Sequence, residues 1–257
     1  MEYEIIDFHT HPYVDDAENM CIYKAGGCMN LTDSVKYLQN MGIFRICGSV
    51  IGARDRAPWD MIRRDNDRVL SIRDMLGDYY IPGFHVHPDY VDESCQEIER
   101  MHAQGIRLVG ELVPRFYSWE DYSCKAFDEI LDTAEQYGMV VNFHSLDNDQ
   151  MDAMVRKHPN LVLVAAHPNT MENYQRHLDR MKLSRNYYLD LSGTGLFRHR
   201  MLRYGIDQCG ADRFLFGTDY PICNPAMYIG GVVGDSLLSE VEKKLILADN
   251  AKRILKL

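Results

Sequence analysis

Short apolar runs recur along the chain at intervals that leave room for a helix between them. Eight such runs occupy residues 4–8, 44–51, 80–86, 108–113, 139–143, 161–165, 187–191 and 214–216. Most lack the polar–apolar alternation of a half-exposed strand, and continuous apolar runs are typical of parallel strands covered on both faces. The pattern therefore predicts eight buried parallel strands.

Helical periodicity lies between these runs. It predicts helices over residues 32–41, 93–104, 123–137 and 237–255. In the third of these, Phe127, Ile130, Leu131 and Ala134 fall on one stripe, as in a helix packed against a sheet.

Eight strand–helix units predict an α/β fold, a closed (β/α)₈ TIM barrel in which residues 1–257 form a single domain. An open doubly wound sheet is the alternative. That fold usually carries a Gly-rich turn after its first strand, whereas the first run here ends in Asp7-Phe8-His9-Thr10-His11.

Composition and charge limit the classes of partner. The 257 residues carry a formal net charge of -10, which gives no general attraction for nucleic acid or anionic membranes. The acidic N-terminus does not look like a signal peptide, and no apolar run approaches the roughly 20 residues of a membrane helix. The seven cysteines form no Cys-x-x-Cys pair, which predicts reduced thiols in a cytoplasmic protein. We expect a small-molecule substrate and no nucleic-acid or membrane partner; the oligomeric state stays open, a homo-oligomer included.

Imidazoles and carboxylates stand where the predicted strands end. These residues are His9 and His11 (first strand), Glu111 (fourth), His144 (fifth), His167 (sixth) and Asp219 (eighth). Barrel enzymes place their active sites at this end of the strands, and a His-x-His pair on a strand points to one face. Imidazole and carboxylate groups bind zinc, manganese or iron, and such an ion lowers the pKa of a water molecule. The pattern predicts a metal-assisted active site.

Each of these residues also has an ordinary explanation when taken alone. A single histidine at a strand end is more often structural, Asp219 could cap a turn, and Glu111 could pair with Arg107 or Arg115. Their occurrence at five strand ends of one register favours a shared site.

Other residues near the expected site are candidates for substrate contact. Arg54, His85 and Arg115 follow or end the second, third and fourth strands. An arginine there could hold a substrate carboxylate by two hydrogen bonds, with surface solvation as the alternative. His85 and His87 form a second His-x-His, which we interpret as substrate contact or local hydrogen bonding. Segments 12–30 and 221–235 are predicted lids or pocket walls.

Together these motifs resemble the amidohydrolase superfamily, and within it the amidohydrolase 2 (amidohydrolase-related) branch. The resemblance rests on Asp7-Phe8-His9-Thr10-His11, His144, His167, Gly217-Thr218-Asp219-Tyr220-Pro221 and the closing Asn250-Ala251-Lys252-Arg253-Ile254-Leu255. It spans the chain from the first strand to the last helix.

The resemblance implies roles for individual residues. His9, His11 and His144 would bind a divalent metal, and Asp219 would bind it and act as the general base. The sixth-strand histidine, here His167, is a ligand in two-metal members and hydrogen-bonds the water or substrate in one-metal members. Two-metal members bridge their ions with a fourth-strand group, often a carboxylated lysine; TatD-like nucleases use a glutamate, and Glu111 is the candidate here. Zinc is favoured, with manganese or iron as alternatives, as one or two ions.

Four functions remain open on this basis. The first is metal-dependent hydrolysis of an ester, lactone or amide-type bond in a small substrate, with or without a carboxylate group. The second is decarboxylation, because the same branch includes decarboxylases of aromatic and semialdehyde acids. The third is TatD-like phosphodiester cleavage, against which the lack of a Lys/Arg-rich run weighs. The fourth is a non-catalytic metal-binding protein, against which the presence of Asp219 argues.

Overall fold

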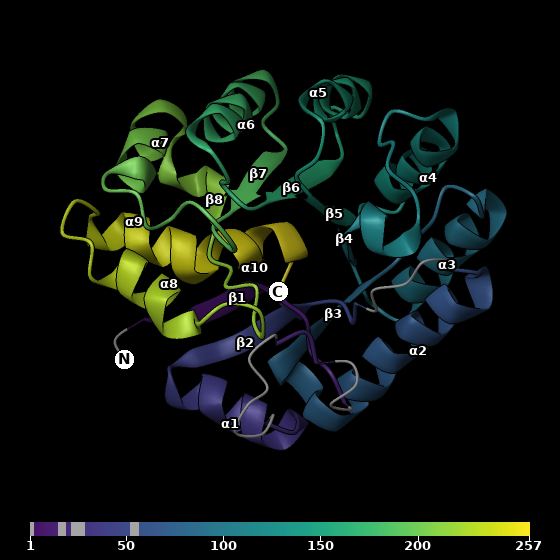
Figure 1. The fold of residues 1–257 in the computed structure, drawn as a ribbon, viewed down its shortest axis with the longest axis horizontal. Helices are drawn as coiled ribbons and strands as arrows, with labels where there is room; N and C mark the ends of the chain where they lie inside the picture. The colour runs from purple at the N-terminus through teal and green to yellow at the C-terminus, as the bar shows by residue number, and fades with distance from the viewer. Residues whose placement is uncertain (1–2, 15–18, 22–28, 52–56) are drawn as a thin grey trace.

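The fold was described from a computed structural model, which covers residues 3–14, 19–21, 29–51 and 57–257. Eight parallel strands form one sheet in chain order, and helices surround it (Figure 1). The strands are β1 (Ile5–Thr10), β2 (Ile43–Gly48), β3 (Tyr80–Phe84), β4 (Leu108–Leu112), β5 (Val140–His144), β6 (Val162–Ala166), β7 (Tyr187–Asp190) and β8 (Phe214–Leu215). All eight coincide with predicted apolar runs, and the predicted (β/α)₈ barrel is confirmed.

The helices alternate with the strands. They are α1 (Leu31–Asn40), α2 (Trp59–Leu76), α3 (Val91–Ala103), α4 (Lys125–Gln136), α5 (Asn148–Lys157), α6 (Met171–Leu183), α7 (Met201–Cys209), α8 (Pro225–Val233), α9 (Glu240–Lys244) and α10 (Asn250–Leu255). Short 3-10 or π turns complete the list: η2 (Gly77–Tyr79), η3 (Pro114–Tyr117), η4 (Ala211–Arg213) and η5 (Leu245–Asp249). Three predicted helices, 32–41, 93–104 and 123–137, correspond to α1, α3 and α4.

The predicted helix over residues 237–255 corresponds to a continuous helical segment from Glu240 to Leu255 that contains a π turn. The chain forms α9, the π turn η5 and α10 in succession, beginning at Glu240 with a Ser239–Glu242 capping box. The carbonyl of Ile246 accepts a hydrogen bond from the amide of Phe216 at 2.9 Å. In η5 this carbonyl therefore accepts a hydrogen bond from the segment that follows β8. The spacing of apolar residues in the sequence does not reveal such a bond.

The barrel closes through backbone contacts between β1 and the segment after β8. Phe8 donates its amide hydrogen to Phe216 O at 2.8 Å, Asp219 donates to His9 O at 2.8 Å, and His11 donates to Tyr220 O at 2.7 Å. The backbone that closes the barrel therefore also carries the first-strand histidines and Asp219.

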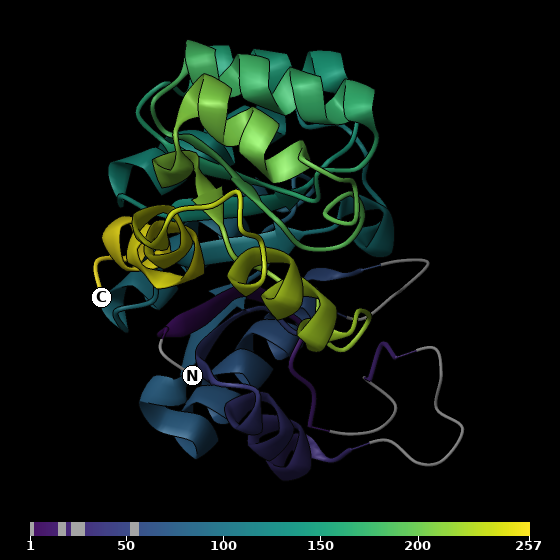
Figure 2. The same cartoon turned by 90° about the vertical axis from the view of Figure 1, so that its left-hand side faces the viewer.

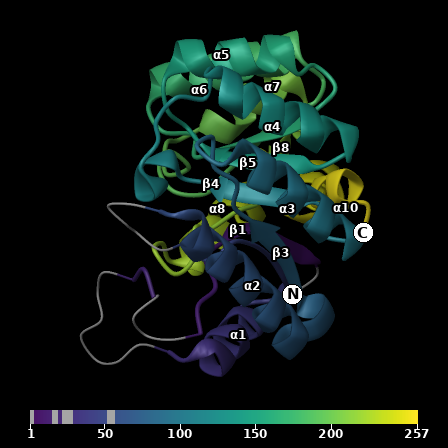
Figure 3. The same ribbon diagram turned by 90° about the vertical axis from the view of Figure 1, so that its right-hand side faces the viewer.

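Apolar core residues and polar residues alternate along the strands toward their carboxyl ends. On β5, Val141 and Phe143 belong to the main hydrophobic core, while Asn142 and His144 alternate with them and make polar contacts. This period of two follows from strand geometry. Figures 2 and 3 show the C-terminus at one end of the barrel and α8 toward the other. Among the described residues, no helix combines the length and apolar character needed to cross a membrane.

We predict that Asn250 anchors the C-terminal helix beneath the barrel. Its buried amide donates to Ala211 O and Phe214 O, both at 2.8 Å. Asn250→Ala leaves two buried carbonyls without these donors, so the free energy of unfolding should fall by about 2 kcal/mol. Denaturant titration measures this loss. The control is Lys252→Ala on the same helix, which removes an exposed ion pair to Glu4 and should change stability by less than about 0.5 kcal/mol; equal losses would contradict the prediction.

Candidate metal centre

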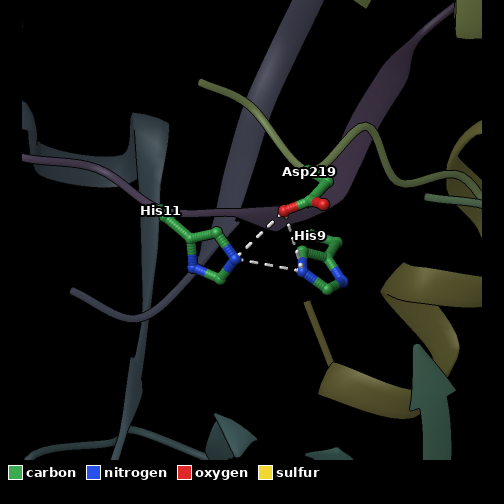
Figure 4. Close-up of side chains that lie close together, drawn as sticks. All are labelled: His9, His11 and Asp219. Atoms are coloured by element: carbon green, nitrogen blue, oxygen red, sulfur yellow. Dashed lines mark hydrogen bonds and ion pairs between the residues drawn. The ribbon is translucent and has the colours of Figure 1, made fainter. Parts of the chain in front are cut away.

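His9, His11 and Asp219 meet at the mouth of the barrel (Figure 4). The two histidine Nε2 atoms lie 3.2 Å apart. Asp219 Oδ1 lies 3.2 Å from His11 Nε2 and 3.6 Å from His9 Nε2. All three residues are buried. Three donor atoms from the two ends of the sequence thus face one point.

The spacing of these atoms fits a shared metal ion. Ligands 2.0–2.1 Å from a tetrahedral ion lie about 3.3 Å from one another. His11 Nδ1 lies 3.2 Å from Ser49 O, and His9 Nδ1 lies 3.0 Å from Asp190 Oδ2. Because both partners can only accept, the Nδ1 atoms carry hydrogens and the two Nε2 atoms are directed toward each other. A cation between them resolves this contact, so the residues fit a divalent metal.

The Glu111 carboxylate divides between two pairs of histidines. Its Oε2 atom lies 3.1 Å from His9 Nε2 and 3.4 Å from His11 Nε2. Its Oε1 atom lies 2.9 Å from His144 Nδ1 and 3.5 Å from His167 Nε2. His9, Glu111 and His167 form a second group that could hold a metal. One carboxylate therefore faces two candidate ion positions. The partners of Glu111 are histidines, rather than Arg107 or Arg115 as the alternative explanation had it.

Burial and charge act against each other in this cluster. Burial alone lowers the pKa of His9, but the Glu111 and Asp190 carboxylates outweigh it and hold that pKa well above its usual value. Burial also opposes protonation of His11, yet hydrogen bonds to Asp219 and Glu111 raise its pKa to about 9. For Glu111 burial raises the pKa, and His9 and the other histidines lower it well below the usual range. Without a metal, protons on the imidazoles compensate the buried carboxylates.

Solvent reaches the cluster from one side. The side chains of His9, His11 and Glu111 are 1%, 3% and 3% exposed, whereas Asp219 is 10% and His144 20% exposed. A small substrate would therefore approach the face that carries Asp219 and His144.

The backbone at two of these residues is unusual. Asp219 has a φ of 66° and His167 a φ of 69°. Non-glycine residues in this left-handed region are uncommon and cluster at functional sites. Asp7 supports the first of these turns, accepting hydrogen bonds from Thr218 N at 2.9 Å and Thr218 Oγ1 at 2.6 Å. Burial raises the pKa of Asp7 to about 7 despite these bonds.

Two residues that the sequence analysis missed orient the histidines. Asp190, the last residue of β7, contacts His9 Nδ1 and accepts from Asn142 Nδ2 at 3.1 Å. The Ser192 hydroxyl donates to Asp190 Oδ1 and lies 3.0 Å from both His9 Nδ1 and His167 Nδ1. Asp190 contacts the His9 ring, whereas Asp7 bonds Thr218. Asp190 and Ser192 are two residues apart at the end of the seventh strand, so their side chains point to one face. This spacing is the only feature of the sequence that indicates a shared role.

The proton positions follow from the donors available. Ser192 has one hydroxyl hydrogen, and Asp190 accepts it. The Ser192 oxygen therefore accepts from His167 Nδ1 and shares the His9 Nδ1 hydrogen with Asp190. Each ring therefore directs its Nε2 toward the cluster, and this is the nitrogen that would bind a metal once its proton is displaced.

Two predicted substrate-contact residues make local contacts, and the third lies outside the described residues. His85 is buried, with Nε2 2.8 Å from Val50 O and its backbone amide bound to Asn66. This is the local hydrogen bonding named as one interpretation. Arg115 is exposed on η3, its guanidinium 5.1 Å from the Phe116 ring. Arg54 falls outside the described residues, as does much of segment 12–30, while segment 221–235 contains α8.

Comparison with known proteins agrees with this geometry. The profile of one protein family, described as amidohydrolase, matches residues 6–257. No curated protein sequence matches the chain.

Three solved structures share the fold at low sequence identity. A 2,6-dihydroxybenzoate decarboxylase from Rhizobium has a TM-score of 0.77 and 16% identity, with 99% of each chain covered. A dihydroxybenzoic acid decarboxylase from Polaromonas sp. JS666, with bound manganese and 2-nitroresorcinol, has a TM-score of 0.74 and 17% identity, covering 99% of this chain and 97% of that one. A probable 2-pyrone-4,6-dicarboxylic acid hydrolase from Acinetobacter baumannii has a TM-score of 0.68 and 14% identity, covering 99% of this chain and 100% of that one.

We predict that Ser192→Ala weakens metal binding on the order of ten-fold, because groups that orient a ligand histidine commonly contribute 10- to 100-fold to affinity. The substitution removes the oxygen that His9 and His167 share. Isothermal titration with Mn²⁺ or Zn²⁺ measures the change. Ser94→Ala is the matched control: this buried serine bonds the backbone of His87, so its loss should affect stability and leave metal affinity unchanged. Equal affinities in wild type and Ser192→Ala would remove the orienting role.

We also predict that metal affinity rises with pH between about 6.5 and 9. In the metal-free protein the pKa of His11 is about 9, so an ion must displace its proton below that value. Each displaced proton changes the affinity about ten-fold per pH unit. The raised pKa also stabilises the metal-free fold fully below pH 6.5, and this contribution is lost as the pH rises through 9. Titrations at pH 6.5, 7.5 and 8.5 test this; His11→Asn should flatten the dependence, and a pH-independent wild type would contradict it.

Proposed function

The chain belongs to the amidohydrolase family, and we propose that it is a metal-dependent hydrolase with two divalent ions bridged by Glu111. Its reaction would be cleavage of an ester, lactone or amide-type bond in a small substrate. The observation that carries the proposal is the division of the Glu111 carboxylate between the His9–His11 pair and the His144–His167 pair. Bridging carboxylates of this kind hold paired ions in hydrolytic sites.

The donors divide into two ligand sets. His9, His11, Asp219 and Glu111 Oε2 would hold one ion. His144, His167 and Glu111 Oε1 would hold the other, and His9, which is also within reach of His167 and Glu111, is assigned to the first ion. Nitrogen and carboxylate oxygen donors suit zinc and manganese alike, and manganese is the ion in the Polaromonas decarboxylase.

The chain's own residues supply the proton transfers. A divalent ion bound here would polarise the scissile carbonyl and lower the pKa of a nearby water molecule. Asp219 is the carboxylate nearest the exposed side of the cluster, so it would accept the proton of the attacking water and return it to the leaving group. His9 and His11 would be held rigid by Asp190 and the Ser49 carbonyl during this transfer.

The substrate would be a small molecule rather than nucleic acid. The net charge of -10 disfavours a polyanion. A small anionic group could still bind, because the ions themselves carry the largest local positive charge.

Decarboxylation is the second candidate, and the likeness to two dihydroxybenzoate decarboxylases favours it. In that reaction the centre would hold the substrate carboxylate and no water need attack. The products separate the two candidates: an acid and an alcohol or amine from hydrolysis, CO₂ from decarboxylation. A panel of p-nitrophenyl esters, lactones and hydroxybenzoates, assayed with Mn²⁺ or Zn²⁺, applies this test; CO₂ release without ester or lactone cleavage would replace the hydrolase proposal.

We predict that the metal content and the activity respond to different acidic residues. Wild-type protein prepared without chelator should carry close to two equivalents of metal. Glu111→Gln should carry one or fewer, since the neutral amide cannot bridge two cations. Asp219→Asn should keep its fold while kcat falls by about 10²–10⁴-fold through loss of the base.

The control is Glu97→Gln, a buried glutamate that pairs with Arg100 and Asn66 away from the cluster. It should retain the metal content and activity of the wild type. Elemental analysis showing a single equivalent in both wild type and Glu111→Gln would sink the bridged centre, and turnover of Asp219→Asn within a few-fold of wild type would remove Asp219 as the base.

A further inference from the structure

An apolar pocket of about 340 Å³ opens between the loop after β7 and helix α8. It is lined by Gly193, Leu196, Phe197, Cys223, Asn224, Met227, Tyr228 and Gly231. None of these side chains is charged, and most are apolar. The volume lies at the lower end of the range for small-molecule sites. The lining chemistry therefore suits a neutral hydrophobic group.

Gly193 lies between the pocket and the His167 ring of the metal centre. Gly193 has a φ of 63°, and a Cβ atom added to it would lie 2.3 Å from His167 Nδ1. The Gly193 backbone thus rests against the His167 ring and also forms a wall of the pocket. The Tyr228 hydroxyl donates to Gly193 O and holds this wall in place.

A second connection runs through the loop after β8. Cys223 lines the pocket, and its amide donates to Asp219 O at 3.1 Å. The pocket is therefore bounded by the two segments that carry Asp219 and contact His167. The pocket and the metal centre are therefore neighbours, joined through the backbone of Gly193 and of the loop after β8.

The pocket rim exposes large apolar side chains. Phe197 is 75% exposed and Met227 70% exposed, on the loop after β7 and on α8. Exposed apolar side chains gathered at a concave site are typical of ligand-binding surfaces. Phenylalanine and methionine side chains also adapt well to a hydrophobic ligand.

We propose that this pocket is the subsite that binds a neutral hydrophobic group of the substrate, while the polar reacting group lies at the metal centre. The inference rests on the proposed function and extends it by naming the substrate class: a small amphiphilic molecule with an aryl or alkyl group beside the bond that reacts. A fully polar substrate would leave the pocket unused.

Two neighbouring glycines on α8 provide a matched test. A Cβ added to Gly231 would lie 3.3 Å from Leu196 Cδ2, so a side chain there enters the pocket. A Cβ added to Gly230 would meet no atom within 4 Å. Because both glycines lie within one helix, replacing either changes helix propensity similarly. Only the change at residue 231 alters the volume of the pocket.

The experiment titrates Mn²⁺-loaded protein with acetate, butyrate and hexanoate. The carboxylate probes the metal centre, and the alkyl chain probes the subsite. Each methylene that leaves water should improve affinity about three- to four-fold, on the order of 100-fold from acetate to hexanoate. Gly231→Leu should reduce this gain to a few-fold, Gly231→Ala should reduce it partly, and Gly230→Leu should retain it. Circular dichroism and thermal melts establish whether each variant is folded. If Gly231→Leu does not fold, the comparison is made with Gly231→Ala.

The outcomes separate the subsite from the function. Equal affinities along the series in the wild type would overturn the subsite, as would an equal loss of the chain-length effect in Gly231→Leu and Gly230→Leu. Absence of acetate binding, together with hexanoate binding that depends on residue 231, would keep the pocket and count against the metal-based function.

Discussion

The structure of the site depends on one buried carboxylate, that of Glu111. A carboxylate withdrawn from water is costly unless positive charge or hydrogen-bond donors compensate it. Here the compensation comes from His9 and His11 on β1, His144 on β5 and His167 after β6. Because β1 lies three strands from β4 in the sheet, its histidines meet Glu111 only when the sheet curls into a barrel. Protons compensate the charge in the metal-free protein, and divalent ions would replace them.

The groups behind the cluster set its geometry. Asp190 and Ser192 direct the Nδ1 hydrogens of His9 and His167 away from the centre. Asp7 fixes the Thr218 turn that holds Asp219 in a left-handed conformation. For the His9 and His167 rings, the hydrogen bond on the far side determines which nitrogen faces the cluster. The buried polar groups stabilise one arrangement of the ligands, which a cluster of flexible side chains would not maintain.

The sequence predicted the barrel well because a strand covered on both faces leaves a continuous apolar run, and the period of two placed His9 beside His11. It predicted the supporting groups poorly. Asp190 and Ser192 end a strand without a motif of their own, and their role arises from a contact with β1, more than 180 residues away in sequence. The second His-x-His carried a misleading signal, because the Nε2 atoms of His85 and His87 bond backbone carbonyls. Only the three-dimensional fold distinguishes these pairs.

The loops and the strand ends carry different kinds of side chain. Strand ends present charged groups in fixed positions, whereas the loop after β7 and helix α8 enclose a pocket without charge. Gly193 allows the two regions to touch, because any side chain there would collide with the His167 ring. This close approach places the uncharged pocket beside the metal centre, where it would meet the hydrophobic part of the proposed substrate. A barrel of this kind can therefore keep its metal chemistry constant while residues such as those at 196, 227 and 231 change which molecule it accepts.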